Sequence, residues 1–188
     1  MGNHNSATVP FTKSGEMTEE GLEHLRRLTG FRKDELVEWH NDLHSSRNVG
    51  TLPGFIQLSR TVALRMKKQP ERDQMLAFIF EACHGQPDFV KLLELAHAWY
   101  SDDQTKQLSI LFDACDRNRN GLIGKSAIGR LLSAASGGPG YSTKQGILLK
   151  AKELLNQADE NRDKKLTRSE FINACKHSDV MRNMILNK

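Results

Sequence analysis

The sequence predicts an all-α protein built from helix-loop-helix units, and two observations support this prediction. Apolar residues recur at helical spacing along almost the whole chain, and hardly any stretch alternates as a half-buried strand does. Two segments, 116–127 and 159–170, are rich in oxygen-bearing side chains, and a helical apolar pattern enters and leaves each of them. With 188 residues, of which 38% are hydrophobic, the chain is long enough to bury a sizeable core.

In the N-terminal half, Leu22, Leu25 and Leu28 predict a helix that stops at Gly30. A second helix carries Leu36, Trp39, His40 and Leu43 on one face. A histidine on such a face is expected to be a buried core residue rather than a ligand. Further helices are predicted over 55–66, 75–83, 89–99 and 108–115.

In the C-terminal half, the helix that follows segment 116–127 is expected to end at the glycine-rich breaker 136–140. Ile147 to Ala158 predict the helix that enters segment 159–170, and Phe171, Ile172 and Cys175 predict the helix that leaves it. The three cysteines, Cys83, Cys115 and Cys175, lie on apolar helical faces and are expected to be reduced core residues.

Segment 159–170 carries the strongest candidate metal site. Its oxygen-bearing side chains fall at positions 1, 3, 5, 9 and 12, and a hydrophobic residue occupies position 8, which is the layout of an EF-hand calcium loop. Ca²⁺ prefers six to eight oxygen ligands at about 2.3 to 2.6 Å. The loop offers the side chains of Asp159, Asn161 and Asp163, the carbonyl of Lys165, the hydroxyl of Thr167 directly or through water, and both carboxylate oxygens of Glu170.

Position 6 of this loop is Lys164, where a sharp turn normally uses glycine because φ is positive. A residue with a side chain pays about 1 to 2 kcal/mol for that conformation. We therefore expect binding at this loop to be weaker than at an ideal one.

Segment 116–127 is a damaged copy of the same loop. It offers the side chains of Asp116, Asn118 and Asn120 and the carbonyl of Leu122, but position 12 is Ala127, so the closing carboxylate is missing. Arg117, Arg119 and Lys125 add positive charge that opposes a dication. We expect this loop mainly to pair with its neighbour, with Ile123 opposite Leu166, and the alternative is a weak metal site.

The N-terminal half contains no such ligand set. The connection between Leu43 and Phe55 holds no carboxylate, and the connection between Cys83 and Phe89 is too short to encircle an ion. The predicted organisation is a flexible N-terminal segment (1–16), an N-terminal lobe with two vestigial EF-hands (17–101), and a C-terminal lobe with loops 116–127 and 159–170 and a tail helix (102–188).

The chain resembles the calcineurin B-like and calcium-and-integrin-binding branch of the EF-hand regulators, and the neuronal calcium sensors are similar. The resemblance rests on Leu28-Thr-Gly30-Phe31 before a Trp-containing helix, on the two paired loops, and on a short hydrophobic tail. It implies four EF-hands in two lobes. It also implies a hydrophobic groove that holds an amphipathic helix of a client phosphatase, kinase, channel, exchanger or receptor tail.

The N-terminus Met1-Gly2-Asn3-His4-Asn5-Ser6 matches the pattern for myristoylation of Gly2. A single myristoyl chain gives only marginal membrane binding, so a second signal is needed. Arg65, Lys67, Lys68 and Arg72 are expected to form a solvated helix face, and the alternative is a contact of this run with anionic lipid or nucleic acid. The formal net charge of +4 is spread along the chain, and no nucleic-acid partner is expected.

Without an apolar run of membrane-spanning length, the protein is predicted to be cytoplasmic, with a lipid at Gly2 as its means of membrane association.

These features predict a non-catalytic regulator that binds Ca²⁺ mainly at segment 159–170 and then engages an amphipathic helix of a partner. The alternative is a calcium-insensitive adaptor with one structural Mg²⁺ or Ca²⁺ site. An enzyme would have to use Cys83 beside His84, but adjacent residues seldom face each other as nucleophile and base. No catalytic residues are therefore expected.

Overall fold

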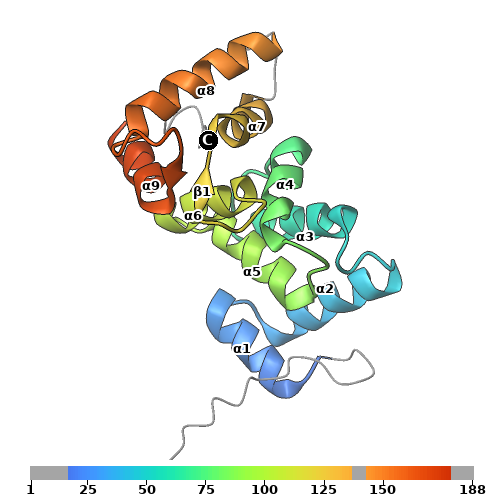
Figure 1. Cartoon of the computed structure of the whole chain (residues 1–188). Helices are drawn as coiled ribbons and strands as arrows, with labels where there is room; N and C mark the ends of the chain where they lie inside the picture. Colours follow the sequence, from blue (N-terminus) through green and yellow to red (C-terminus); the bar gives the residue numbers. More distant parts are fainter. Residues whose placement is uncertain (1–16, 137–142, 179–188) are drawn as a thin grey trace, which may run out of the picture.

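The computed structural model describes residues 17–136 and 143–178, and over these residues the protein is mostly helical (Figure 1), which confirms the predicted all-α class. The first helices along the chain are α1 (Glu19–Thr29), α2 (Lys33–Ser45), α3 (Leu52–Arg65), α4 (Asp73–Phe80), the 3-10 helix η1 (Glu81–Cys83) and α5 (Phe89–Tyr100). The remaining elements are α6 (Gln104–Cys115), β1 (Leu122–Ile123), α7 (Lys125–Ser136), α8 (Lys144–Ala158), β2 (Leu166–Thr167) and α9 (Arg168–His177).

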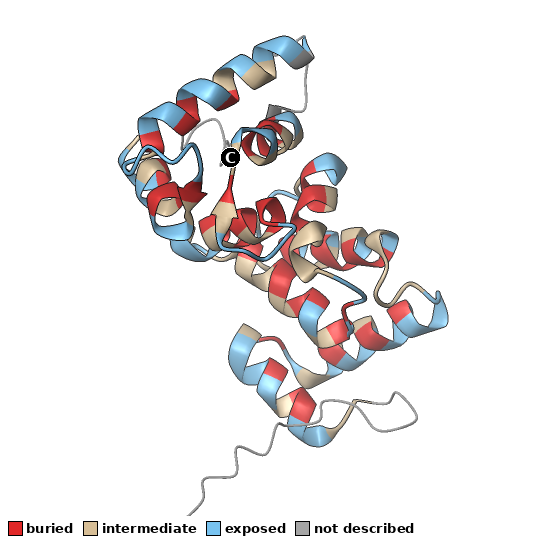
Figure 2. Cartoon of the chain, in the orientation of Figure 1, coloured by how far each residue is buried: buried red, intermediate tan, exposed pale blue. Residues whose placement is uncertain are grey.

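The molecule is elongated, with α1 at one end and α8 and α9 at the other (Figure 1). Helix α3 packs on α5, α7 packs on α8, and α4 contacts both α6 and α7. The buried apolar side chains form one continuous cluster that runs from Leu22 to Cys175. Buried residues line the faces along which the central helices meet, and exposed residues cover the outer faces of α1, α2 and α8 (Figure 2). Both halves of the chain therefore share one apolar core.

The turn between α1 and α2 forms where the sequence predicts it. Gly30 ends α1 with φ of 71°, the left-handed conformation that glycine adopts without strain. Leu22 and Leu25 lie in the core as expected, whereas Leu28 is 44% exposed because it lies on the solvent side of the helix.

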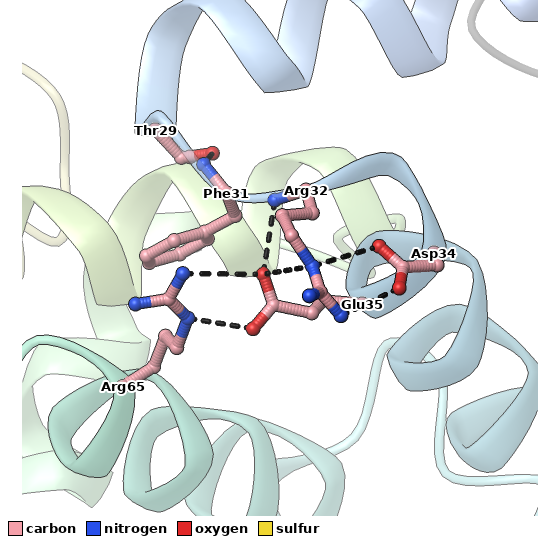
Figure 3. Close-up of polar contacts among 6 residues, drawn as sticks. All are labelled: Thr29, Phe31, Arg32, Asp34, Glu35 and Arg65. Atoms are coloured by element: carbon pink, nitrogen blue, oxygen red, sulfur yellow. Dashed lines mark hydrogen bonds and ion pairs between the residues drawn. The ribbon is translucent and has the colours of Figure 1, made fainter.

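A charged cluster ties this turn to α3 (Figure 3). The carboxylate of Glu35 accepts hydrogen bonds from Arg65 Nε (2.6 Å) and from the backbone N–H of Arg32 (3.0 Å). These contacts hold the pKa of Glu35 below its usual value, with the Arg65 hydrogen bond as the main cause. The guanidinium of Arg65 also lies over the ring of Phe31, 5.7 Å from its centre. The start of α2 and the end of α3 are therefore fixed to each other.

A buried amide joins α5 to α6. Gln107, which is 6% exposed, donates from Nε2 to the backbone carbonyls of Trp99 (2.8 Å) and Ser101 (2.7 Å). These hydrogen bonds satisfy carbonyls at the end of α5, which the helix itself leaves without a partner. The predicted boundary between 101 and 102 falls within this connection, and the division into two lobes stays a prediction.

The structure differs from the sequence prediction at the basic run 65–72. This run is not a helix face, because α3 ends at Arg65 and Lys67 takes a left-handed φ of 57°. Arg65 pairs with Glu35, Lys68 pairs with Asp102, and Arg72 donates to the carbonyl of Ala135 (2.6 Å). Three of the four cations therefore make contacts within the chain.

A second difference lies at the helix predicted over 75–83. It divides into α4 and η1, because the chain turns at His84 and Gly85, whose φ values are 50° and 144°. The connection that follows lies beside the one between α2 and α3: a Cβ atom added at Gly50 would lie 2.9 Å from the carbonyl oxygen of Pro87. The two N-terminal connections are therefore neighbours in space.

Candidate metal centre

The two oxygen-rich loops lie side by side through the strands β1 and β2. The strands pair antiparallel, with Ile123 opposite Leu166 and Leu122 opposite Thr167. Ile123 and Leu166 are both buried. The structure thus contains the residue pair that the sequence predicted between the loops.

In loop 159–170 the side chains at positions 1, 3 and 5 all turn back towards the loop backbone. The carboxylate of Asp159 accepts hydrogen bonds from the N–H groups of Asp163 (3.2 Å) and Lys164 (2.8 Å). The amide oxygen of Asn161 also accepts from Asp163 N–H (2.9 Å), and Asp163 accepts from Lys165 N–H (2.8 Å). Such side-chain hydrogen bonds to the local backbone are typical of Asp and Asn in turns. They hold three oxygen-bearing groups against the backbone of the loop.

The carboxylate at position 12 also faces the loop. Glu170 is buried, and its Oε2 accepts hydrogen bonds from the Thr167 backbone N–H (2.8 Å) and hydroxyl (2.7 Å). These two contacts lower the pKa of Glu170, and burial opposes them. The backbone N–H groups of Glu160 and Asn161 lower it further, so the carboxylate reaches the beginning of the loop. Glu170 is therefore ionised at neutral pH.

The side chains of loop 159–170 are of the kinds that bind a cation through oxygen atoms. Asp159, Asn161, Asp163 and Glu170 offer side-chain oxygens, and the loop contains no sulfur or imidazole ligand. Thr167 differs from the expectation, because its hydroxyl caps α9 by accepting from the Glu170 N–H (3.3 Å). Across 17–136 and 143–178, no three side chains of His, Cys, Asp or Glu converge as a metal-binding group. In this arrangement backbone N–H groups, which carry partial positive charge, hold the carboxylates of the loop.

Both loops bend in the same way. In loop 159–170 the residues at positions 4 and 6, Arg162 and Lys164, have φ values of 62° and 65°. In loop 116–127 the corresponding residues, Arg119 and Gly121, have φ values of 54° and 74°. Lys164 therefore adopts the left-handed conformation that its position predicts, and it pays the cost that Gly121 avoids.

Loop 116–127 repeats the hydrogen bonds of its neighbour without the closing carboxylate. Asp116, which is 7% exposed, accepts from the N–H groups of Asn120 (3.1 Å) and Gly121 (2.7 Å), and Asn120 accepts from Leu122 N–H (3.1 Å). Asn118 is exposed. At position 12, Ala127 contributes only a methyl group. The loop therefore keeps its shape through the hydrogen bonds that Asp116 and Asn120 accept from its backbone.

The arginines of loop 116–127 point to another partner, which the sequence did not indicate. Arg117 donates to both carboxylate oxygens of Glu81 (2.8 and 2.6 Å), and Arg130 donates to Glu81 Oε2 (2.6 Å). Arg119 donates to the carbonyl of His84 (2.7 Å). From the sequence, Arg117 and Arg119 were expected to oppose cation binding. In the structure they bind Glu81 of η1 and the carbonyl of His84, which follows η1. No local pattern connects Glu81 with residues so distant in sequence.

We call Glu81, Arg117 and Arg130 the η1 joint. Burial by itself raises the pKa of Glu81, but the hydrogen bonds from Arg117 and Arg130 outweigh it, and the net direction is downward. Arg130 also donates to the carbonyl of Cys115 (3.2 Å) at the end of α6 and lies over the ring of Phe78 in α4 (5.9 Å). The joint therefore links loop 116–127, α6 and α4.

Three further predictions concern Cys83, Gly2 and the tail helix. Burial raises the pKa of Cys83 to about 11, so this side chain is a neutral thiol at neutral pH. Gly2 and the predicted tail helix beyond residue 178 lie outside the described residues.

No protein-family model matches this chain, and no curated protein sequence matches it either. Among the described helices, none combines the length and apolar character that crossing a membrane requires. Inference about function therefore rests on the geometry of the two loops and their surroundings.

Replacing Lys164 with glycine should raise the free energy of unfolding by about 1 kcal/mol, because glycine adopts the left-handed conformation without strain. The adjacent Lys165 is the matched control: it is exposed and does not have a positive φ. Lys165→Gly should lower stability by about 0.5 to 1 kcal/mol. Urea unfolding of both variants measures the difference, and equal effects would contradict the assignment of strain to Lys164.

Replacing Glu81 with glutamine should lower the free energy of unfolding by about 1 to 2 kcal/mol at neutral pH, because the two arginines lose a charged, partly exposed acceptor. The folded-state pKa of Glu81 lies below its ordinary value of 4.5. Its contribution is therefore complete above that value and is lost as the pH falls through the folded-state pKa. Urea unfolding at pH 7 and at about pH 3 should show a smaller difference at the lower pH. Glu71→Gln is the control, because the Glu71 carboxylate accepts from the neighbouring Arg72 backbone N–H and, within the described residues, pairs with no arginine side chain.

Proposed function

We propose that this chain is a calcium-binding, non-catalytic regulatory protein of the EF-hand type, with loop 159–170 as its main site. The observation that carries the proposal is the shared geometry of the two loops. Each begins with an aspartate that accepts the N–H groups of positions 5 and 6, and each has left-handed residues at positions 4 and 6. The loops also meet at position 8 of both through β1 and β2. One of them has in addition an ionised glutamate that faces its interior.

The proposed ligands are those the sequence predicts: Asp159, Asn161, Asp163, Lys165, Thr167 and Glu170. The carboxylates of this loop now interact with backbone N–H groups, which carry partial positive charge. Ca²⁺ would offer them a double positive charge instead. Glu170 is held by Thr167 through both the backbone N–H and the hydroxyl, so direct ligation by Thr167 would disturb the cap of α9. We therefore favour a water-mediated role for Thr167.

The proposed response starts at the two ends of the loop. Asp159 follows the last residue of α8, and Glu170 lies in the first turn of α9. Ligation by both carboxylates would change the angle between these helices. Phe171, next to Glu170, packs against Phe112 of α6 with ring centres 6.0 Å apart. Movement of α9 would therefore alter the apolar contact with α6 and expose surface for an amphipathic helix of a partner.

The proposed architecture is two lobes of paired helix-loop-helix units, with degenerate loops in the N-terminal lobe. The closeness of Gly50 and Pro87 supports this, because it brings the two N-terminal connections together as β1 and β2 bring the C-terminal loops together. Neither connection offers a set of carboxylates. Cation binding is therefore assigned to the C-terminal half.

A second candidate function is a structural adaptor with one Mg²⁺ or Ca²⁺ site and little response to calcium. The η1 joint and the continuous core favour it, because they resist movement of one half against the other. Dye binding to exposed apolar surface separates the two functions. A regulator gains dye fluorescence on addition of calcium, whereas a static adaptor does not.

Calorimetric titration of the full chain should give one Ca²⁺ per chain, with a Kd towards the weak end of about 10⁻⁷ to 10⁻⁵ M. Glu170→Gln should abolish binding, because it removes the bidentate ligand. Glu160→Gln is the matched control, since Glu160 is an exposed carboxylate at position 2 of the same loop. If Glu170→Gln binds calcium as the wild type does, the site assignment is wrong.

Ala127→Glu should raise the stoichiometry from one towards two. Asp116 and Asn120 already have the hydrogen bonds seen in the other loop, and Arg117 and Arg119 are engaged by Glu81 and the His84 carbonyl. Ser126→Glu is the control, because it adds the same charge one position earlier. A variant at 127 that gains no site would identify the loop backbone or its arginines as the obstacle.

A further inference from the structure

The side chain of Arg168, at position 10 of loop 159–170, reaches from the start of α9 to α6. Its guanidinium donates hydrogen bonds to the carbonyl oxygen (3.3 Å) and the hydroxyl (2.6 Å) of Ser109, and it pairs with the carboxylate of Asp113. It also lies over the ring of Phe112, 4.7 Å from the ring centre. Phe112 and Asp113 follow Ser109 by three and four positions, so all three lie on one face of α6. We call this set of contacts the Arg168 latch.

Helix α6 is a fixed support for the latch. Near its start, Gln107 donates to the carbonyls of Trp99 and Ser101. At its end, the carbonyl of Cys115 accepts a hydrogen bond from Arg130 of α7 (3.2 Å). Helix α9 packs on α6 and α8 at one end of the molecule (Figure 1). The latch therefore holds the first turn of α9 against a helix that is itself tied to other elements.

The latch adjoins the proposed calcium ligand at position 12. Arg168 and Glu170 both lie in the first turn of α9, so a movement of one carries the other with it. Phe171 follows Glu170 and packs on Phe112, the ring over which Arg168 lies. Helix α9 therefore contacts the Phe112 ring at two points, one apolar and one charged. A change in the angle of α9 that separates the two rings loosens the Arg168 contacts as well.

We propose that the Arg168 latch stabilises the calcium-free position of α9 and thereby lowers the calcium affinity of loop 159–170. The inference rests on the proposed function, in which calcium moves α9. A contact made only in the calcium-free arrangement lowers calcium affinity by its own free energy, and calcium weakens the contact in return. The side chains of Arg168 and Asp113 are 44% and 40% exposed, so the ion pair is weak enough for a bound cation to overcome.

Calcium titration of the full chain by calorimetry tests the latch through Asp113→Asn. This variant should bind calcium about two- to fivefold more tightly than the wild type, because the latch loses its charged acceptor. A simple charge effect predicts the opposite, since removing a carboxylate near the loop makes its surroundings more positive. Arg168→Lys keeps the charge but loses the planar guanidinium, and it should also bind more tightly. The double variant should gain little beyond either single one, because both substitutions break the same contact.

Glu153→Gln is the matched control. Glu153 also carries a partly exposed carboxylate in an ion pair, but its partner Lys150 lies on the same helix, α8, so the pair ties no two elements together. The control should bind calcium no more tightly than the wild type. Asp113→Asn replaces a partly exposed side chain by one of equal size and is expected to fold, which its helical circular dichroism verifies.

Binding of an apolar dye without calcium is the second measurement. Asp113→Asn should bind more dye than the wild type and than Glu153→Gln, because α9 is then held less firmly on α6. If the wild type binds calcium but Asp113→Asn binds it equally or more weakly, the latch is wrong and the proposed function stands. Dye binding that does not rise in Asp113→Asn would also overturn the latch. A wild type that binds no calcium at millimolar concentration would overturn both.

Discussion

The C-terminal part of this protein depends on two aspartates, Asp116 and Asp159. Each follows the last residue of a helix and accepts two backbone N–H groups from four and five residues further along. These hydrogen bonds curl the chain so that the next helix returns beside the first. They also bring Ile123 and Leu166 opposite each other, where both are buried. Without these carboxylates the loops would have no partner for those N–H groups, and the strands would lose their register.

The same hydrogen bonds explain how one geometry serves two purposes. In loop 159–170 the carboxylates accept hydrogen bonds from backbone N–H groups, which carry partial positive charge. A dication would interact with the same carboxylates through a larger positive charge. In loop 116–127 the hydrogen bonds to Asp116 and Asn120 maintain the shape, although Ala127 occupies the position of the closing carboxylate. The arginines of that loop then hold Glu81 and the His84 carbonyl. One loop is suited to a ligand, and the other connects the C-terminal half to η1.

Much of this arrangement follows from local sequence. Gly30 predicts the end of α1 and Lys164 predicts a strained left-handed turn, because each depends on neighbours within a few residues. The pairing of Ile123 with Leu166 could be predicted because both residues hold position 8 of the same loop pattern. The η1 joint does not follow from local sequence, since Glu81 and Arg117 meet only after the helices pack. The hydrophobic pattern of the sequence does not indicate the strands β1 and β2, because two residues are too few to show alternation. The cap role of Thr167 was missed because a hydroxyl at position 9 suits a ligand and an N-cap equally well.

The central claim is that loop 159–170 binds calcium and loop 116–127 keeps the same shape without it. Amide NMR of the full chain during a calcium titration measures both loops in one experiment. The N–H groups of Asp163, Lys164 and Lys165 donate to the carboxylates of loop 159–170, so their resonances should shift and saturate as one site. The N–H groups of Asn120 and Gly121 should shift far less. Shifts confined to loop 116–127, or no shift in either loop at millimolar calcium, would contradict this account.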